Sequence, residues 1–344
     1  MSTPKLGFEE SLEKAVVSIE KCAGCAACVI VCPFNCLEYK DEKPNLIKKC
    51  EKCGICPKIC PRYEWSLPQV EKFVFGRERN ANEDFGIQQR LAIAQAADKN
   101  ILAKCQDGGV VTALLTYALK NGIIDAAVVS SLSQEKPFHP TPKLAKTPEE
   151  VLDSAGTRYT YSPNLLALNE GVKQKIESLA FVGTPCQIHA IRKMQMLPLK
   201  KYVEPIKFTI GLMCTESFAY DGFIQKHVQN SMGLDPNAIS KMNIKGKIII
   251  TTKTGETKTI PLTEVKRYTR KGCLHCNDFS SEFADISTGG LGLSEWTFTI
   301  IRTKQGQEIF EKAEKDGALR TRSVEEEKSA LDLLVKLSRR KQAK

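Results

Sequence analysis

The sequence predicts an α+β protein, in which a small cysteine-rich N-terminal domain precedes a larger domain of mixed α/β layers. Three observations predict this class. The length of 344 residues exceeds the ~100–200 residues of a typical single domain. Most of the 14 cysteines lie before residue 65, and strand-like and helical patterns alternate clearly only after residue 105. We therefore assign the two domains to residues 1–65 and 66–344.

The composition predicts a folded protein that does not span a membrane. Hydrophobic residues make up 42% of the chain, which is enough for a packed core. No apolar run approaches the ~20 residues that cross a bilayer, and no apolar stretch follows a basic start. We therefore expect a cytoplasmic protein that does not span a membrane, with peripheral attachment to the inner face of a membrane left open. In a reducing compartment the cysteines are expected to bind metal rather than to form disulfides.

Positive charge is concentrated outside the cysteine-rich region. Residues 1–64 carry a net charge of +1, and the remainder carries +9. Five positive charges lie between Lys336 and Lys344 without an acidic residue. We interpret this run as a solvated tail, although a basic surface also attracts anionic lipid or a small anionic ligand. Nucleic acid is not expected as a partner, because no aromatic-rich reading surface accompanies the charge.

Two cysteine runs dominate the N-terminal domain. Residues 22–33 read CAGCAACVIVCP, and residues 50–61 read CEKCGICPKICP. Both follow C-x2-C-x2-C-x3-C-P, the run of bacterial two-cluster 4Fe–4S ferredoxins, in which the fourth cysteine of each run binds the other cluster. Structural zinc is disfavoured, since zinc sites use paired C-x2-C knuckles. The predicted ligand sets are Cys22, Cys25, Cys28 and Cys60 for one cluster, and Cys50, Cys53, Cys56 and Cys32 for the other.

Short elements are expected around these runs. The apolar-rich segment 15–21 predicts a first short strand, and residues 34–49 predict a hairpin or turn between the two halves. Small residues such as Gly24 and Gly54 let backbone N–H groups approach the cluster sulfurs. Cys36 is spare in this scheme, and we interpret it as a small buried hydrophobe.

The larger domain shows clear patterns from residue 105 onward. A glycine turn, Gln-Asp-Gly-Gly, precedes apolar residues at helical spacing, and Asn121-Gly122 ends them. Backbone N–H groups at such a helix start can hold an anion, although turn chemistry alone explains a Gly-Gly pair equally well. The elements expected in this domain are a helix at 110–120, a strand at 123–129, a strand at 179–182, a turn at 183–186, a helix at 187–194, a strand at 208–212, a helix at 218–232, a hairpin of 244–252 and 258–262, and a charged helical region at 305–341.

Four further cysteines come from three separate segments. Cys186 and Cys214 each follow a predicted strand, and Cys273 and Cys276 form Cys-Leu-His-Cys. They would suit one metal centre, but zinc and plain buried thiols remain open on spacing alone. The sequence contains no paired carboxylates, Ser–His–Asp set or phosphate loop that we recognise. An enzyme without such groups leaves its chemistry to bound cofactors.

Four motifs, taken in order, resemble those of a known family. They are QDGGVV at residues 106–111, AGTRY at 155–159, VGTPCQI at 182–188, and CLHC at 273–276 followed by ADIS at 284–287. From about residue 90 to 310 the chain resembles the coenzyme F420 hydrogenase/dehydrogenase beta-subunit family. With the cysteine-rich domain in front, it resembles those members of the family through which electrons enter from reduced F420.

The resemblance implies bound FAD, coenzyme F420 as substrate and a third 4Fe–4S cluster, so that residues 66–344 form an FAD-binding catalytic domain. It assigns the third cluster to Cys186, Cys214, Cys273 and Cys276, which leaves Cys36 and Cys105 without a ligand role. The residues that it implies in FAD binding are Gln106, Asp107, Gly108, Gly109, Gly156, Thr157, Arg158, Tyr159, Gly183 and Thr184. Among them, Arg158 would pair with a phosphate as a bidentate donor, or would simply pin its loop.

The implied function is oxidation of reduced F420 (F420H2) by hydride transfer to FAD, with single electrons passing through three 4Fe–4S clusters to a redox partner. That partner is expected to be a membrane-bound respiratory complex or a ferredoxin. The positive charge of the larger domain would help to capture the phosphate and glutamate tail of F420. One alternative is a ferredoxin-dependent flavin and iron–sulfur reductase of F420 or of a pigment-like substrate, running in the opposite direction. The other is a non-catalytic electron relay, against which the glycine turns argue because a relay needs no flavin pocket.

Overall fold

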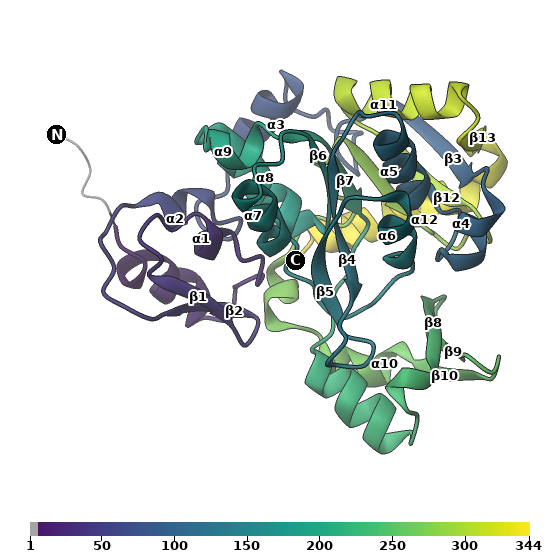
Figure 1. Ribbon diagram of the computed structural model, residues 1–344, viewed down its shortest axis with the longest axis horizontal. Helices are drawn as coiled ribbons and strands as arrows, with labels where there is room; N and C mark the ends of the chain where they lie inside the picture. The colour runs from purple at the N-terminus through teal and green to yellow at the C-terminus, as the bar shows by residue number, and fades with distance from the viewer. Residues whose placement is uncertain (1–5) are drawn as a thin grey trace.

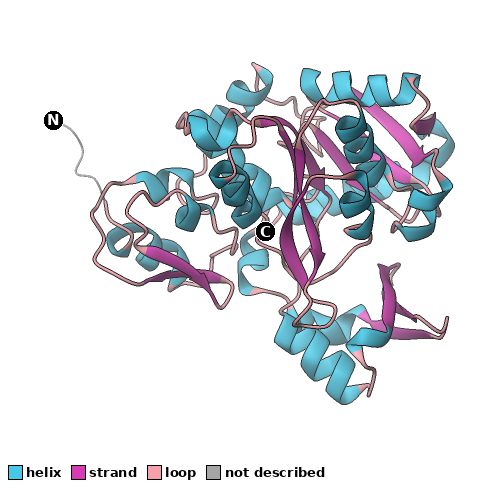
Figure 2. Cartoon of the chain, in the orientation of Figure 1, coloured by secondary structure: helices cyan, strands magenta, loops and turns pink. Residues whose placement is uncertain are grey.

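The computed structural model describes residues 6–344, so residues 1–5 of the predicted N-terminal domain lie outside the described residues. Figure 1 shows a small N-terminal unit, drawn in purple, beside a larger unit built on a twisted sheet. A second, smaller sheet projects from the lower edge of the larger unit (Figure 2). Helices flank the large sheet, which confirms the predicted mixed α/β class. No helix within residues 6–344 is both long and apolar enough to cross a bilayer.

The N-terminal unit contains two short helices that each begin within a cysteine run. Its elements are η1 (Glu9–Val17), α1 (Ala27–Ile30), β1 (Leu37–Lys40), β2 (Lys43–Leu46) and α2 (Ile55–Ile59). β1 and β2 pair antiparallel, which confirms the hairpin predicted within residues 34–49. The strand predicted at 15–21 is wrong. The chain forms the π-helix η1 instead, because Phe8, Leu12 and Val16 recur every four residues and bury one face of a helix.

The large unit is built on an eight-stranded mixed sheet with the strand order β13-β3-β12-β11-β7-β6-β4-β5. β4, β6, β7 and β11 run parallel at its centre, and antiparallel pairs flank them. β6 is buried along its whole length because helices cover both of its faces. The strands are β3 (Arg90–Ala96), β4 (Ala126–Leu132), β5 (Pro140–Ala145), β6 (Leu179–Gly183), β7 (Ile206–Leu212), β11 (Ile286–Gly289), β12 (Thr297–Ile301) and β13 (Leu319–Arg322).

Two helical layers cover the two faces of this sheet. On one face, α5 and α11 share a hydrophobic cluster with Ala180 and Val182 of β6. On the other face, α7 and α8 share a cluster with Phe181. Alternate residues of a strand point to opposite faces, so one strand anchors both layers. The helices of the large unit are α3 (Leu67–Phe75), α4 (Lys99–Lys104), α5 (Val110–Lys120), α6 (Pro148–Asp153), α7 (Leu165–Lys173), α8 (Pro185–Met196), α9 (Lys200–Val203), α11 (Lys304–Lys315), η6 (Val324–Glu327) and α12 (Lys328–Gln342).

The segment between β7 and β11 forms the smaller sheet. β9 and β10 make the predicted hairpin, and β8 adds a third antiparallel strand. Phe223, Ile224 and Val228 of η2 pack with buried residues of these strands and give the sheet a core of its own. The elements of the segment are η2 (Asp221–Ser231), η3 (Pro236–Ala238), β8 (Ile239–Ile244), β9 (Lys247–Thr252), β10 (Thr257–Pro261), α10 (Leu262–Val265), η4 (Lys266–Tyr268) and η5 (Lys271–His275).

The basic C-terminal run belongs to helix α12. Leu334 of this helix is fully buried, and Lys341 is only 4% exposed. The Arg339 guanidinium pairs with Asp84 through hydrogen bonds of 2.8 and 2.9 Å, and the Lys341 ammonium donates to the Thr215 carbonyl. The run is therefore part of a packed helix rather than a free tail, because α12 has an apolar face that packs on β3 and β12. Its charges are solvated as expected at Lys336, Arg339, Arg340 and Lys344, which are exposed, and only Lys341 is buried.

A buried ion pair at Asp285 joins α8 to the large sheet. The carboxylate accepts hydrogen bonds from the Arg192 guanidinium at 2.9 Å, from the Thr209 amide and hydroxyl at 2.7 Å each, and from the Thr303 hydroxyl at 2.7 Å. Burial raises the pKa of Asp285, but Arg192 and the hydroxyl donors outweigh burial and hold this pKa below its usual value. The carboxylate therefore stabilises the fold above the unfolded-state pKa of about 4, and this contribution is lost as the pH falls.

We expect Asp285→Asn to destabilise the fold by about 3 kcal/mol, because it leaves Arg192 buried without its counter-charge. The matched control is Asp84→Asn, which removes the more exposed pair with Arg339 and should destabilise by about 1 kcal/mol or less. Urea unfolding at neutral pH, followed by circular dichroism, measures both variants. Equal unfolding midpoints for the two variants would contradict the role given to the buried pair.

Candidate functional site

A cavity of about 360 Å³ lies at the carboxyl ends of the central parallel strands. It is bordered by Gly183 of β6, Leu212 of β7 and Gly289 of β11, and by the start of α5 at Gly109. Open α/β sheets bind ligands at this edge, where strands end and helices begin. The volume falls within the ~300–1,000 Å³ of ligand pockets, at the lower end, so a dinucleotide would also extend into the open part of the cleft.

All but one of the residues predicted to bind FAD line this cavity. They are Gln106, Asp107, Gly109, Gly156, Thr157, Arg158, Tyr159, Gly183 and Thr184. Gly108 is the exception. Its N–H group donates to the Thr297 hydroxyl at 3.0 Å, and a Cβ atom there would come within 2.5 Å of the Ala94 carbonyl oxygen. Gly108 therefore lets the turn pack closely on β3 and β12, so that its neighbours border the cavity.

The turn before α5 leaves one polar atom without a partner. The Gln106 side-chain amide donates to the Met242 carbonyl at 2.6 Å. Its buried Oε1 atom has no hydrogen-bond partner among the described residues. Gly109 adopts a φ of +70° at the N-cap of α5, a left-handed conformation that glycine adopts without strain. A ligand N–H group would satisfy the Gln106 oxygen.

Arg158 supplies positive charge to the cavity. Its Nη1 atom donates to the carbonyls of Ser154 at 2.8 Å and of Gly156 at 2.9 Å, and these bonds pin its own loop. Burial lowers the pKa of Arg158 to about 10. No carboxylate within residues 6–344 offsets this effect, so the guanidinium charge is available to an anionic ligand.

The two N-terminal cysteine runs share one backbone geometry. In the first run, Gly24 and Ala26 flank the second cysteine with φ angles of +70° and +67°. In the second run, Lys52 and Gly54 flank the second cysteine with φ angles of +48° and +73°. Left-handed residues within such loops turn successive N–H groups toward one side, which makes an anion-binding concavity of the kind found at iron–sulfur sites.

Backbone N–H groups donate to sulfur atoms in these runs. Hydrogen bonds to iron–sulfur ligands of this kind tune the cluster potential. The bonds run from Gly24 N to Cys22 Sγ at 3.4 Å, from Phe8 N to Cys50 Sγ at 3.4 Å, from Cys36 N to Cys32 Sγ at 3.3 Å, and from Arg62 N to Cys60 Sγ at 3.5 Å.

The thiols of each predicted N-terminal set lie close enough for their charges to interact. Burial raises the pKa of Cys56 to about 12, and Cys53, Cys50 and Cys32 add to the shift. In the other set, Cys22, Cys25 and Cys60 all interact with Cys28. Buried thiols of this kind become thiolates when a metal replaces the proton. Thiols of the two runs therefore lie near one another, and their division into two ligand sets stays a prediction.

The third set of cysteines converges beside the cavity. Cys214 lines the cavity, and Cys186 shares hydrogen bonds with the Thr184 hydroxyl at 3.3 Å and the Tyr161 hydroxyl at 3.5 Å. Burial raises the pKa of Cys214, Lys341 opposes this, and the other three members of the set add to it. The set consists of Cys186, Cys214, Cys273 and Cys276.

A single-ion site and a 4Fe–4S cluster arrange their ligands differently. Within residues 6–344, no three His, Cys, Asp or Glu side chains lie close enough to hold a single metal ion. Zinc draws its sulfur ligands to about 2.3 Å from one ion, whereas a 4Fe–4S cube carries its ligands on separate iron atoms. The two spare thiols instead bond to carbonyls, Cys36 to that of Lys49 at 3.2 Å and Cys105 to that of Asp107 at 2.9 Å.

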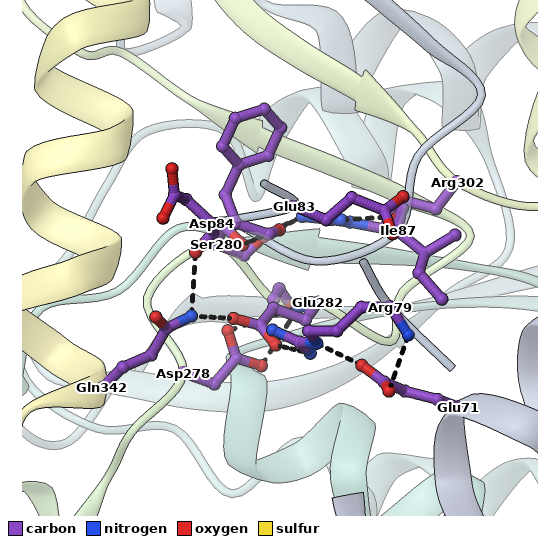
Figure 3. A network of polar contacts seen from close by, with 12 residues as sticks. Glu71, Arg79, Glu83, Asp84, Ile87, Asp278, Ser280, Glu282, Arg302 and Gln342 are labelled. Atoms are coloured by element: carbon purple, nitrogen blue, oxygen red, sulfur yellow. Dashed lines mark hydrogen bonds and ion pairs between the residues drawn. The ribbon is translucent and has the colours of Figure 1, made fainter. Parts of the chain in front are cut away.

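A polar network fixes the loop that follows the third set (Figure 3). Arg79 bridges Glu71 of α3 and Glu282 of the loop, and Gln342 of α12 donates to Glu282 at 3.1 Å. The Glu282 amide donates to Asp278 at 3.0 Å. Two helices that are far apart in the sequence, α3 and α12, therefore hold this loop in place.

Comparison with known proteins identifies the family. Two family models match, both of the beta subunit of coenzyme F420 hydrogenase/dehydrogenase. The model of its N-terminal part matches residues 91–169, and the model of its C-terminal part matches residues 176–327. The chain belongs to the coenzyme F420 hydrogenase/dehydrogenase beta-subunit family. Its relatives are subunits of oxidoreductases, and this family member is an oxidoreductase.

Relatives in the family match different shares of the chain. The beta subunit of coenzyme F420 hydrogenase from Methanosarcina barkeri is 41% identical over 256 residues, which are 72% of this chain and 86% of that protein. A subunit of the F(420)H(2) dehydrogenase from Methanosarcina mazei is 32% identical over 330 residues, which are 94% of this chain and 89% of that protein. A chain of the F420-reducing NiFe hydrogenase complex from Methanosarcina barkeri superposes with a TM-score of 0.73 at 38% identity, covering 77% of this chain and 92% of that one. Similarity to the dehydrogenase protein thus extends over almost the whole chain.

Several side chains that join the two units of this family member were not predicted from the sequence. The Lys193 ammonium donates to the Cys60 carbonyl at 2.9 Å, and the Arg270 guanidinium donates to the Ala23 carbonyl at 2.9 Å. No sequence pattern marks such cations, because their partners lie more than 100 residues away along the chain. The missed cations near the cysteine sets are Arg62, Lys193, Arg270 and Lys341.

We expect Cys273→Ser to lower the iron content of anaerobically purified protein by about four atoms out of about twelve, because each 4Fe–4S cluster holds four irons. Cys36→Ser is the matched control, since the Cys36 thiol is buried but belongs to no predicted set. Iron determination per polypeptide, together with electron paramagnetic resonance of the reduced protein, measures the loss. Full iron content in Cys273→Ser would contradict the third set.

Proposed function

We propose that this chain oxidises F420H2 by hydride transfer to FAD and delivers single electrons through three 4Fe–4S clusters to a redox partner. The observation that carries the proposal is the cavity, which is bordered both by the predicted FAD residues and by Cys214 of the third cysteine set. Bound FAD would supply the exchange between electron pairs and single electrons that the side chains of this chain do not offer. In this proposal residues 1–65 are a two-cluster ferredoxin domain, and residues 66–344 are the FAD-binding catalytic domain.

The chain's own residues would bind and orient the dinucleotide. The Arg158 guanidinium would meet a phosphate, and the unpartnered Gln106 oxygen would accept a hydrogen bond from an N–H group of the ring. Thr184 forms a capping box with Gln187, in which the Thr184 amide donates to Gln187 Oε1 at 3.1 Å. This box would hold the Gly183–Thr184 turn rigid beside the ring.

Basic residues of the smaller sheet would attract the anionic substrate. Lys245 lines the cavity, and the Lys241 ammonium donates to the Cys105 carbonyl at 3.2 Å. F420 carries a phosphate and a glutamate tail, so positive charge at the open side of the cavity would favour its capture. Burial raises the pKa of Asp107 at this side of the cavity, and Lys241 and Lys245 oppose that shift.

The order of the cysteine sets supports an electron path away from the cavity. Cys214 of the third set borders the cavity. Cys186 of that set lies close enough to Cys25 for their thiolate charges to interact, and Cys28 does the same with Cys56. Electrons would therefore leave the cavity through the third set, pass the set that contains Cys25, and reach the set that contains Cys56.

The last set in this order lies near the surface. Cys50 and Cys53 are partly exposed, and Phe34 beside them is 45% exposed. A membrane-bound electron-transfer complex or a ferredoxin would approach there, with the chain itself cytoplasmic or attached to the inner face of the membrane.

Turnover with F420H2 tests the proposed function. The protein is purified without oxygen, reconstituted with FAD and iron sulfide, and mixed with F420H2 and an artificial one-electron acceptor. We expect rapid, FAD-dependent appearance of the oxidised deazaflavin absorbance. No turnover in a sample that holds FAD and about twelve irons would reject F420H2 as the donor.

The opposite direction is tested with the same sample. Reduced ferredoxin and oxidised F420 replace the donor and the acceptor, and F420H2 formation is followed. Faster reduction of F420 than oxidation of F420H2 would favour the ferredoxin-dependent reductase.

We expect Arg158→Gln to weaken FAD binding about 10- to 100-fold, because a charge-assisted hydrogen bond contributes about 1.5–3 kcal/mol. Arg77→Gln is the matched control, since Arg77 is an exposed arginine paired with Glu83. Fluorescence titration of the flavin-free protein with FAD measures the affinity. An unchanged affinity for FAD together with lost F420H2 oxidation would contradict the phosphate role of Arg158.

A further inference from the structure

Arg62 lies between two of the cysteine sets. Its backbone N–H group donates to Cys60 Sγ at 3.5 Å. Its guanidinium reaches the other way, where Nη1 donates to the carbonyl of His275 at 3.0 Å and Nη2 donates to that of Gly272 at 3.5 Å. His275 directly precedes Cys276, so one residue contacts the ligand loops of two sets, one in each unit.

The charge of Arg62 is not balanced by a carboxylate. Among residues 6–344 its guanidinium hydrogen-bonds to the backbone carbonyls of His275 and Gly272 and forms no ion pair with an Asp or Glu side chain. The buried Nε atom of Arg62 also has no hydrogen-bond partner in this part of the chain. The guanidinium therefore lies against the turn that carries Cys273 and precedes Cys276, without a carboxylate counter-charge.

Arg270 joins the same two units, but its charge is balanced. It donates to the Ala23 carbonyl, lies 4.1 Å above the centre of the Tyr161 ring and forms an ion pair with Glu42. Both arginines join the N-terminal unit to the large unit, and of these two Arg62 is the one without a carboxylate partner among residues 6–344. Arg270 therefore holds the two units together, whereas Arg62 holds them together and also leaves its charge free to act on the cysteine sets.

We propose that Arg62 is a positioning residue for electron transfer, whose charge raises the reduction potentials of the two clusters that it bridges. In the step concerned, the cluster of the third set loses one electron and the cluster that contains Cys60 gains it, and no bond or proton changes. A nearby cation stabilises the added electron on either cluster, as net charge and hydrogen bonds set cluster potentials. This inference rests on the proposed function, because it requires clusters at both sets.

Redox titration of the holoprotein, followed by electron paramagnetic resonance, tests the role of Arg62. In Arg62→Gln we expect the ratio of reduced to oxidised cluster at a fixed potential to fall about tenfold for both bridged clusters, a shift of about 59 mV for a one-electron couple. The cluster of the set with Cys50 should keep its midpoint, as an internal reference. Arg62→Lys keeps the charge as a compact ammonium and should keep both midpoints near the wild-type values. Arg77→Gln, which changes an exposed arginine, should leave the midpoint potential of every cluster unchanged.

Each other result overturns the inference in a distinguishable way. Wild-type protein that lacks the iron of either bridged set would overturn the proposed function and this inference together. If the wild-type protein holds its full iron and Arg62→Gln leaves both cluster midpoints unchanged, this inference alone is overturned. Equal shifts in Arg62→Gln and Arg62→Lys would assign the residue to packing. If Arg62→Gln loses iron, its midpoints cannot be compared, and Arg62→Lys is the deciding variant. Because lysine keeps the positive charge, a tenfold change in the ratio of reduced to oxidised cluster in Arg62→Lys would exclude a role of the charge.

Discussion

Compensation of buried thiolate charge is the constraint on which the rest of this structure depends. Cysteine binds metal as the thiolate, and a buried anion is unfavourable unless cations or N–H donors face it. Left-handed turns direct N–H groups toward the N-terminal sets. Arg62, Arg270 and Lys341, from three distant segments, face the third set. The third set therefore has all of its counter-charges only when the N-terminal unit, the large sheet and α12 are packed together.

The parallel strands explain why the cavity and the third set are neighbours. β6 and β7 pair in parallel, so their carboxyl ends lie side by side. β6 continues through Gly183 and Thr184 to Cys186, and β7 continues to Cys214. Each strand thus supplies both a border of the cavity and a candidate ligand. Under the proposed function, the glycine of the VGTPC motif would let backbone approach the flavin ring on one side of the turn, while the cysteine sulfur would face a metal centre on the other.

Local sequence patterns predicted local structure, and long-range packing decided the rest. Helix α5 has the predicted bounds, because Gly109 and Asn121-Gly122 enclose an apolar helical repeat. The residues around the cavity could be named from short motifs, but Thr297 beneath Gly108 could not, since it lies on a distant antiparallel strand. The strand expected at 15–21 and the description of residues 336–344 as a tail both missed a packed helical face. In both segments the apolar residues repeat at helical spacing and bury a face against partners that the sequence does not name.

The hydrophobic core continues across residue 65, and this fixes the joint where Arg62 lies. Ala27 and Ile59 of the N-terminal unit share one buried cluster with Leu165 and Leu168 of α7. Opening such a joint would expose apolar surface to water, so the N-terminal unit is held against the large unit rather than tethered by a mobile linker. The distance between the two bridged cysteine sets is then constant, and electron transfer between them needs no docking step. The guanidinium of Arg62 is therefore held at a fixed place beside the turn that carries Cys273, where its charge can act on both cysteine sets.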